Sequence, residues 1–245
     1  MDTLALLDRF PKVRPPLSER IQAIYAEHYK SNRSGGTPAA SLSQRMERWL
    51  HHSVAADRKH RGDDVETLEL GAGTLNQLPY EEPVGKYDVV EPFTALYADS
   101  PHRAKVRDFF ADMADVPKDR RYDRITSVAT FEHITNLPEV VAWSGLLLKD
   151  GGQLRASIPS EGTPLWTLGW MMTTGLEFRL RYQADYGELM RHEHVNTASE
   201  IEAVLRHFYA DVRVRCFGVM RWLSLYQFIE CAKPRREACE AYLSR

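Results

Sequence analysis

The segment that most constrains this chain is residues 67–76, which read TLELGAGTLN. It predicts a buried strand followed by a tight glycine turn, and the apolar pair before Glu91 predicts a second strand that ends in an acid. Gly71 and Gly73 lack a Cβ, so the backbone there can come close to a ligand. An acid at the tip of the next strand can accept hydrogen bonds from both hydroxyls of a ribose. Together these features predict a nucleoside site.

Two kinds of nucleoside cofactor use this layout. A dinucleotide site needs a third glycine for close helix packing, in the pattern G-x-G-x-x-G, and Asn76 occupies that position here. The acid-x-G-x-G loop of Glu69, Gly71 and Gly73 instead resembles that of class I S-adenosylmethionine-dependent methyltransferases. Leu75 replaces the third glycine that is common in that family. The structural alternative is an ordinary turn between strand and helix that carries two glycines.

Further segments resemble the same family in the same order. Asp112 and Met113 resemble the acid and apolar residue that flank the adenine after the third strand. Residues 122–133 resemble the fourth strand with the Glu-His pair that follows it, and residues 146–154 resemble the helix, glycine turn and fifth strand. The resemblance extends over residues 65–234, and five elements in register are far more specific than one loop.

The resemblance implies an S-adenosylmethionine site at the carboxyl ends of these strands. Glu91 would hold the ribose, the glycine turn would admit the methionine portion, and Glu69 would fix the loop or the amino group. Thr130 would contact the cofactor. The expected cofactor-binding residues are Glu69, Gly71, Ala72, Gly73, Glu91, Pro92, Asp112, Met113 and Thr130.

The order of patterns along the chain predicts an α/β fold. Alternating strands and helices from residue 65 to 159 indicate a parallel sheet with helices on both faces. Residues 212–219 and 224–231 predict two strands joined by a short turn, which the resemblance implies and a dinucleotide fold does not. We expect a Rossmann-like, seven-stranded, mostly parallel sheet with a terminal antiparallel hairpin. An N-terminal helical cap at 1–62 would precede a methyltransferase domain at 63–245, with a helical lid inserted at 161–196.

Composition predicts a soluble enzyme. The chain has 245 residues and 43% hydrophobic content, enough for one α/β domain with additions. A net charge of −2 and a pI near 6.5 give no overall field that attracts nucleic acid. Three widely spaced cysteines argue against a disulfide framework. With no signal-peptide pattern and no apolar run of roughly 18 residues, we expect a cytoplasmic protein without a transmembrane segment, which at this size often forms a homodimer.

Two histidines are the candidate general bases. Methyl transfer from a sulfonium is an in-line displacement that requires positioning and exclusion of water. An alcohol acceptor must also lose its proton, and histidine is the usual base near neutral pH. His133 follows the fourth strand and His194 lies in the lid. For His133, packing of the loop against the next helix is an equal alternative, and for His194 the alternative is a solvated turn.

No metal site is expected from the sequence. His192 and His194 flank Glu193, and a His-x-His pair can bind a metal ion, but the sequence identifies no further ligands for it. On an extended segment both histidines would face one side.

The lid and the N-terminal cap carry further candidates. An acid and two tyrosines suit a polyhydroxylated acceptor, although an ordinary amphipathic helix is the more common outcome. Trp166 and Trp170 could line an apolar pocket, touch a lipid carrier or pack the lid down. In the cap, Tyr29 and Arg33 stand where N-terminal helices often cover the cofactor in this family. In the lid, the two tyrosines and the two acids that would contact a polyhydroxylated acceptor are Tyr182, Asp185, Tyr186 and Glu188.

These observations predict a methyltransferase that uses S-adenosylmethionine to methylate a small-molecule or glycan-like acceptor, at oxygen. One alternative is a small-molecule methyltransferase of secondary or quinone metabolism, which a more apolar pocket around Trp166 and Trp170 would favour. A protein of another class, a non-catalytic cofactor-binding partner, would bind the cofactor without turnover. Asn76 and the terminal hairpin count against a nicotinamide-dependent oxidoreductase.

Overall fold

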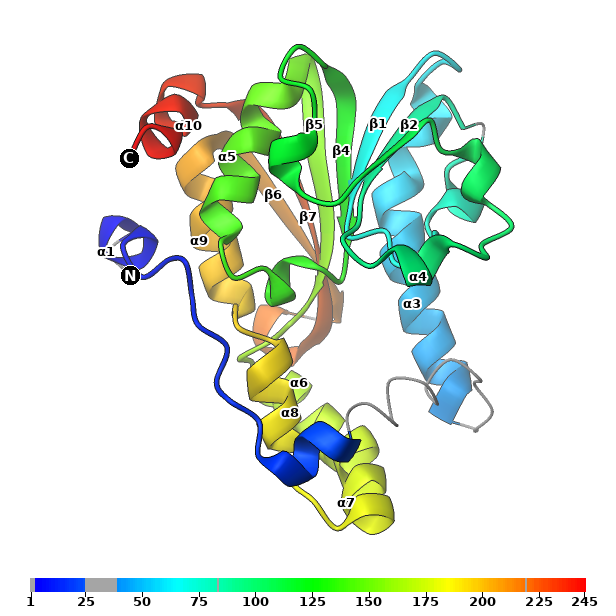
Figure 1. Cartoon of the computed structure of the whole chain (residues 1–245), viewed down its shortest axis with the longest axis vertical. Helices are drawn as coiled ribbons and strands as arrows, with labels where there is room; N and C mark the ends of the chain where they lie inside the picture. Colours follow the sequence, from blue (N-terminus) through cyan, green and yellow to red (C-terminus); the bar gives the residue numbers. More distant parts are fainter. Residues whose placement is uncertain (1–2, 25–38, 83, 219) are drawn as a thin grey trace.

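The computed structural model describes residues 3–24, 39–82, 84–218 and 220–245, and it places side chains in the second range from residue 45 onward. These residues form one sheet flanked by helices, with a group of helices beyond one end of the sheet (Figure 1). Tyr29 and Arg33, predicted to cover the cofactor, lie outside the described residues.

The sheet has seven strands in the order β3-β2-β1-β4-β5-β7-β6. The first five strands are parallel, and β7 runs antiparallel to both β5 and β6. This confirms the predicted mostly parallel, Rossmann-like sheet with a terminal antiparallel hairpin. The strands are β1 (Glu66–Leu70), β2 (Lys86–Val90), β3 (Asp108–Phe110), β4 (Tyr122–Val128), β5 (Leu148–Pro159), β6 (Tyr209–Gly218) and β7 (Ser224–Pro234).

Helices pack on both faces of the sheet (Figure 1). One face carries α5 (Leu137–Leu147), α9 (Ala198–Phe208), α10 (Arg236–Leu243) and the short α1 (Thr3–Leu7), which share the main hydrophobic core. The other face carries α3 (Ala39–Ala55). A capping box formed by Thr197 and Glu200 begins α9, as the sequence predicts.

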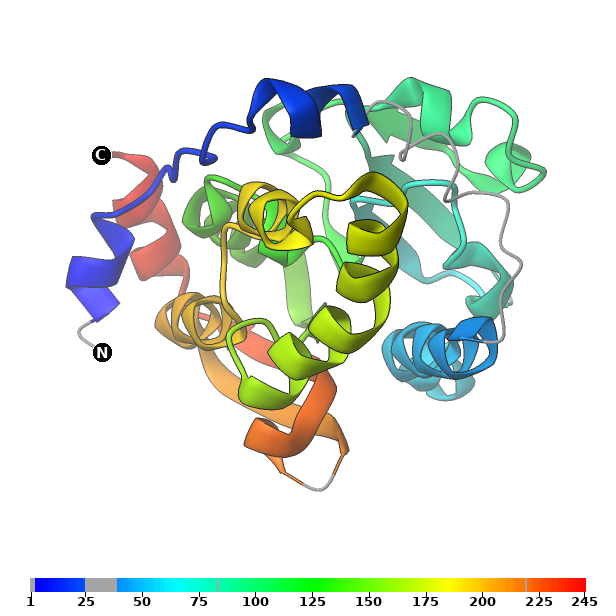
Figure 2. The ribbon, with the colours of Figure 1, turned by 90° about the horizontal axis from the view of Figure 1, so that it is seen from below.

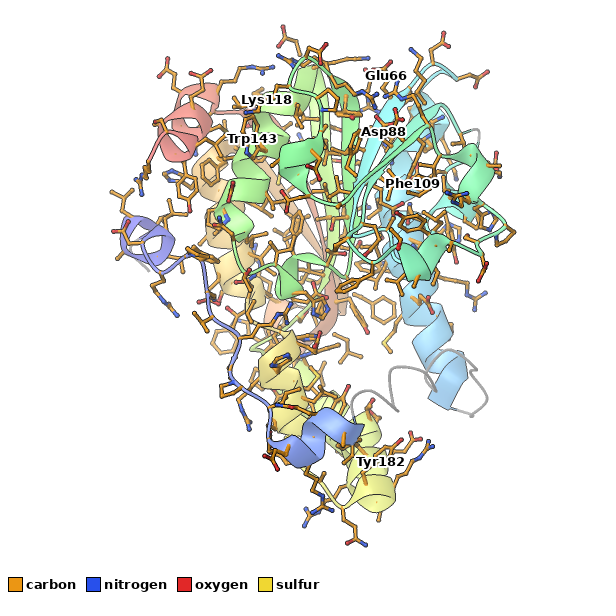
Figure 3. The ribbon with its side chains drawn as sticks, in the orientation of Figure 1. Glu66, Asp88, Phe109, Lys118, Trp143 and Tyr182 are labelled. Atoms are coloured by element: carbon orange, nitrogen blue, oxygen red, sulfur yellow. The ribbon has the colours of Figure 1, made fainter. Side chains whose placement is uncertain are left out.

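The lid consists of α6 (Pro164–Trp170), a π turn (Met171–Gly175), α7 (Leu176–Tyr182) and α8 (Tyr186–Glu193). Seen from below, these helices lie in front of the sheet (Figure 2). Glu66 and Asp88, near the amino ends of β1 and β2, lie far from Tyr182 of the lid (Figure 3). The lid therefore covers the carboxyl ends of the parallel strands, where ligands bind in such folds. The division of the chain at residue 62 stays a prediction.

The expected alternation of strands and helices is only partly correct. Among the described residues, the connection from β1 to β2 holds one 3-10 turn, Leu78–Tyr80, and that from β2 to β3 holds the four-residue α4 (Thr94–Tyr97) together with another 3-10 turn, Arg103–Lys105. Of the crossovers between the parallel strands, only that from β4 to β5 contains a long helix, α5. Helix α3, which precedes β1, packs against β4, β5 and β7 on the face of the sheet opposite α5 and α9. Because α3 already covers this face, the connections between the first strands can remain short.

Two buried arginines of the sheet terminate α3. The last carbonyls of a helix have no partner within the helix, and cations near them are stabilising. Arg155 donates from Nε to the carbonyl of Val54 at 2.8 Å and from Nη2 to that of Ser53 at 2.9 Å. Arg124 donates from Nη2 to Val54 at 3.2 Å. The sheet therefore fixes where α3 ends.

Two carboxylates compensate these buried charges. Arg124 is fully buried, and its Nη1 and Nε atoms lie 2.5 Å from Glu81 and 2.8 Å from Asp57. Asp57 also lies 3.2 Å from Arg155. Removing one member of such a buried group leaves an uncompensated charge, which costs far more than losing an exposed pair.

We expect Arg124→Met to lower the free energy of unfolding by about 3–5 kcal/mol, because buried Glu81 would lose its nearest cation and Asp57 would lose one of the cations around it. Urea denaturation of the purified protein measures this change. Lys105→Met, the matched control, removes an ion pair with exposed Glu82 and should leave the free energy of unfolding nearly unchanged. Equal effects of the two substitutions would show that the buried network does not stabilise the fold.

Candidate functional site

The glycine turn after β1 needs glycine at its first position for two reasons. Gly71 has φ +68°, in the left-handed region, and Gly73 has φ +52°. A Cβ on Gly71 would lie 2.3 Å from Cγ2 of Thr130, whereas one on Gly73 would meet open space. The backbone N–H of Gly71 donates to the carbonyl of Val90 at 2.8 Å. The turn is thus locked between β2 and the segment after β4.

Leu75 keeps the backbone conformation that a third glycine would adopt. Its φ is +68° and its side chain is fully buried beside Leu78, Tyr87 and Val89. The left-handed backbone costs a residue with a side chain roughly 1–2 kcal/mol. Burying a leucine gains about 1.5–3 kcal/mol. Burial therefore offsets the strain, which explains how the turn tolerates the departure from the family pattern.

Glu91, at the end of β2, organises the turn. Its two carboxylate oxygens accept hydrogen bonds from the backbone N–H groups of Gly73 and Phe93, both at 2.9 Å. An ionised carboxylate offers about four lone-pair sites, so acceptor positions remain for ribose hydroxyls. Ala72 and Pro92 lie next to these bonded groups, in the same two loops. The contacts are compatible with the predicted ribose role of Glu91.

Glu69 lies beneath the turn and is 2% exposed. It accepts a hydrogen bond from the hydroxyl of Tyr87 at 2.8 Å. Burial raises the pKa of Glu69 to about 8, against the opposing effect of the Tyr87 bond. The side chain is therefore mostly protonated at neutral pH and closed off from the surface. Its hydrogen bond goes to β2 and not to the glycine turn, so both roles predicted for it, fixing of the loop and binding of the amino group, stay predictions.

The remaining predicted cofactor residues follow β3 and β4. Asp112 is exposed and accepts from the N–H of Ala114 at 2.8 Å. The side chain of Met113 is buried in the main core. Thr130 donates to the carbonyl of Gly71 at 3.3 Å and to that of Val128 at 3.1 Å. The structure thus brings the predicted residues to the carboxyl ends of four neighbouring strands, with Met113 turned inward.

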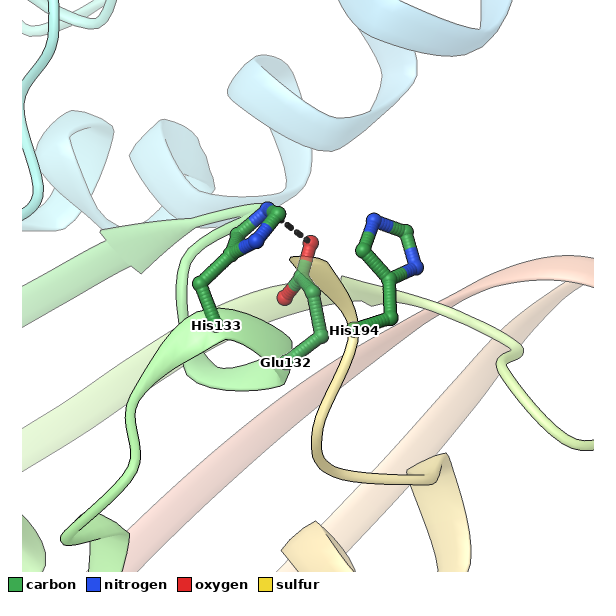
Figure 4. A group of neighbouring side chains, drawn as sticks. All are labelled: Glu132, His133 and His194. Atoms are coloured by element: carbon green, nitrogen blue, oxygen red, sulfur yellow. Dashed lines mark ion pairs between the residues drawn. The ribbon is translucent and has the colours of Figure 1, made fainter. Parts of the chain in front are cut away.

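The two predicted base candidates come together beside Glu132 (Figure 4). His133 ends a 3-10 turn that begins one residue after Thr130, and His194 comes directly after α8. The two rings are 4.8 Å apart between centroids, at 84° to one another. The Glu132 carboxylate is 2% exposed, and its Oε1 lies 3.8 Å from Nε2 of His133. Burial raises the pKa of Glu132.

Each ring is oriented through its Nδ1 atom. Nδ1 of His133 lies 2.9 Å from the carbonyl of Glu193, and Nδ1 of His194 lies 2.7 Å from Oε2 of Glu161. Burial opposes protonation of His133, but the hydrogen bond to Glu193 and the charge of Glu132 outweigh it and raise the pKa of His133. The bond from His194 lowers the pKa of Glu161 despite its burial. Both Nε2 atoms stay available.

One buried asparagine joins the lid to the turn after β4. Asn196 donates from Nδ2 to the carbonyls of Phe131 at 2.8 Å and Ile134 at 2.7 Å, and its N–H donates to the carbonyl of Glu132 at 3.1 Å. These bonds explain how His194 reaches His133.

The N-terminal segment braces the same place. Arg14 donates to the carbonyls of His133 at 2.7 Å, His192 at 2.8 Å and Glu193 at 3.1 Å. Sequence reasoning missed Arg14, Glu161 and Asn196 as supporting residues. Their partners lie far along the chain, and no local pattern marks them.

Several lid residues make contacts within the protein, and their contact with an acceptor stays a prediction. Asp185 caps α8 by accepting from Gly187 at 2.9 Å, and Glu188 accepts from the N–H of Ser18 at 2.5 Å. His192 lies on α8 and its Nδ1 contacts the carbonyl of Pro15 at 2.7 Å. The expectation that His192 and His194 share an extended segment is therefore wrong, because α8 continues as far as Glu193.

Comparisons with known proteins identify the family. A family model described as "Methyltransferase domain" matches residues 37–209. The chain belongs to this family. With the glycine turn and the sheet order, it is a class I methyltransferase that uses S-adenosylmethionine. A search of curated proteins found no match.

Solved structures of similar fold include enzymes that act on different atoms. The N-methyltransferase NodS of Bradyrhizobium japonicum is 13% identical, with a TM-score of 0.52 over 77% of this chain and 97% of its own. An O-methyltransferase family protein of Burkholderia thailandensis is 14% identical, with a TM-score of 0.54 over 95% and 68%. The plantazolicin methyltransferase BpumL, solved with S-adenosylhomocysteine, is 13% identical, with a TM-score of 0.53 over 78% and 84%. At these identities the likeness extends to the fold alone.

The described helices of the methyltransferase include none with the length and apolar character of a membrane span.

We expect Gly71→Ala to destabilise the methyltransferase more than Gly151→Ala does. Both glycines have a left-handed backbone, at φ +68° and φ +78°, but a Cβ on Gly151 would meet open space. The shared backbone strain costs about 1 kcal/mol, and the clash with Thr130 adds about 1–3 kcal/mol. Urea denaturation gives both values, and titration calorimetry should show weakened S-adenosylmethionine binding for Gly71→Ala alone. Equal losses for the two variants would contradict a locked turn.

We expect Glu69→Gln to gain stability relative to the wild type as pH rises from about 5 to 8. The pKa of Glu69 in the folded protein, about 8, lies above its ordinary value of 4.5. Between these values the unfolded chain releases a proton that the folded chain retains, so wild-type stability falls with rising pH. Glutamine does not titrate. Urea denaturation at several pH values measures the difference, and a difference that stays constant with pH would show that Glu69 is ionised when folded.

Proposed function

We propose that the methyltransferase transfers its methyl group to an oxygen of a small or glycan-like acceptor. The observation that carries this proposal is the pair of oriented histidines, His133 and His194, next to the glycine turn. The N–H of His133 donates to the carbonyl of Thr130 at 2.9 Å, and Thr130 itself contacts Gly71. The free Nε2 atoms therefore lie near the end of the turn that would hold the methionine portion of the cofactor.

The chemistry requires little beyond positioning and proton removal. The acceptor oxygen attacks the methyl carbon as the carbon–sulfur bond breaks, and S-adenosylhomocysteine leaves as a neutral thioether. A hydroxyl acceptor must lose its proton in this step, which a histidine near neutral pKa can accept. The Glu161 carboxylate at Nδ1 of His194 fixes the ring and stabilises it once protonated, as a carboxylate does beside histidine in a catalytic triad.

Aromatic side chains of the lid and sheet support a ring-shaped acceptor. Trp166 lies over His194 with centroids 6.4 Å apart at 18°, and it meets Tyr226 edge-on at 5.3 Å. Its indole N–H donates to the same Glu161 that orients His194, at 2.8 Å. A half-exposed aromatic wall beside a base suits the face of a sugar ring, and this arrangement favours the glycan-like acceptor.

A hollow in the lid, apart from the histidine pair, favours the alternative, a small-molecule acceptor of secondary or quinone metabolism. It has a volume of about 640 Å³ and mixes aromatic and apolar side chains with one arginine, one glutamine and one carboxylate, that of Asp185. Trp170, Met171, Leu176, Tyr186 and Arg179 are among the residues that line it. The tryptophan, methionine and leucine of this lining would fit an apolar ring system better than a sugar.

We expect His194→Ala to lower turnover by about 100- to 10,000-fold and to leave S-adenosylmethionine affinity unchanged. Release of S-adenosylhomocysteine measures turnover, with nucleotide sugars, glycans and phenolic compounds as the acceptor panel, and titration calorimetry measures affinity. His192→Ala is the matched control, because His192 lies outside the pair and should keep full turnover.

Full turnover by His194→Ala would show that His194 only supports the fold. Cofactor binding by the wild type without turnover of any acceptor would favour a non-catalytic cofactor-binding partner instead.

A further inference from the structure

We propose that Glu132, His133 and His194 form a binding site for one divalent transition-metal ion. Their potential ligand atoms all lie within 4.8 Å of one another. The carboxylate lies between the two imidazole rings, which come from the turn after β4 and from the end of the lid (Figure 4). The sequence did not indicate this site, because Glu132 and His194 are far apart along the chain.

The spacing is close to what a shared ion needs. Ligands at roughly 2.0–2.2 Å from a tetrahedral zinc ion lie about 3.3–3.6 Å from one another. Nε2 of His133 and Oε1 of Glu132 are 3.8 Å apart, too far for a hydrogen bond and near this range. A contraction of about 1.2–1.5 Å at the widest separation would complete the three-ligand set. Rotation of the His194 ring and the Glu132 side chain can supply it.

The groups behind the histidines match those found around metal sites. A metal-bound histidine almost always donates its other ring N–H to a carbonyl or a carboxylate, which fixes the tautomer. Here the Glu193 carbonyl binds Nδ1 of His133, and the Glu161 carboxylate binds Nδ1 of His194. Both partners select the tautomer whose Nε2 carries a lone pair.

The buried Glu132 carboxylate lacks a hydrogen-bond partner for one of its oxygens. Its Oε2 atom is buried and has no hydrogen-bond partner, and its side chain is 2% exposed. A buried carboxylate without a full set of partners is costly, and proteins pair such groups or use them to bind metals. A cation beside the rings, bound at Oε1, would compensate the charge of this carboxylate. This unpartnered carboxylate is independent of the histidine geometry and indicates the same ligand.

The donor set favours zinc-like ions over magnesium. Imidazole suits Zn²⁺, Co²⁺ and Fe²⁺, whereas Mg²⁺ prefers oxygen donors. Three protein ligands leave a position open, as in catalytic zinc sites. The acceptor hydroxyl of the proposed reaction would take that position, and this one point rests on the proposed function. Coordination lowers the pKa of a bound oxygen, so the loaded site would not need a free histidine base.

Titration calorimetry of metal-stripped, untagged protein with Zn²⁺ tests the proposal. We expect one-to-one binding by the wild type and no comparable binding of Mg²⁺. Glu132→Gln and His194→Ala should each weaken binding by about 100-fold or more. Glu161→Gln changes the group that orients the His194 ring but none of the three ligands, so it should weaken binding by about 10- to 100-fold. His192→Ala is the matched control and should bind as the wild type does. Co²⁺ should give a visible absorption band that Glu132→Gln lacks.

A stability measurement separates lost ligation from misfolding. Glu132→Gln removes a buried charge, so without metal its midpoint of thermal unfolding should equal or exceed that of the wild type, and Zn²⁺ should raise only the wild-type midpoint. Absence of Zn²⁺ binding by the wild type, or equal binding by every variant, would overturn the proposal. Either result leaves the proposed methyl transfer standing, because cofactor binding and turnover by the metal-free enzyme are measured separately.

Discussion

The side-chain amide of Asn196 is the contact on which the site depends. The turn after β4 leaves the carbonyls of Phe131, Glu132 and Ile134 outside any regular ladder, and buried carbonyls need partners. Asn196 supplies the donors from one residue, and in doing so it fixes the last segment of the lid against the sheet. Two segments far apart along the chain thereby become one rigid surface. The histidine pair needs this rigidity, since catalytic or metal-binding groups tolerate displacements of only a fraction of an ångström.

The two faces of the sheet are stabilised by different means. On the α5 and α9 face an apolar core excludes water, whereas on the α3 face buried charges of Arg124 and Arg155 meet carboxylates and the carbonyls that end α3. Apolar packing tolerates small shifts, but a buried ion network requires a fixed geometry. The glycine turn is followed in the described residues by a short 3-10 turn, Leu78–Tyr80, and Glu81 next to that turn pairs with Arg124. The fixed geometry of the ion network therefore helps to hold the glycine turn in place. Helix α3 thus takes over the covering role of a crossover helix.

Local patterns predict the fold well, and the residues that they mark for the cofactor lie together at one edge of the sheet. The glycine turn, Glu91 and the terminal hairpin each depend on neighbours in sequence or on the strand order, so TLELGAG and the capping box at Thr197 were informative. The supporting residues were not predictable, because Arg14, Glu161 and Asn196 act on groups brought near only by tertiary folding. The extended segment expected at His192 was wrong for a related reason: α8 continues through it as far as Glu193, while His192 binds the carbonyl of Pro15.

The N-terminal segment has a consequence for how this enzyme can be divided. The matched family region begins at residue 37, whereas Lys12 and Arg14 lie well before it. Lys12 binds Glu200 at the start of α9, and Arg14 gathers carbonyls on either side of the histidine pair. The boundary of the recognisable domain is therefore not the boundary of the working unit. A module cut at the family limit would retain the cofactor loop yet lose the contacts that Lys12 and Arg14 make with α9 and with the carbonyls beside the histidine pair.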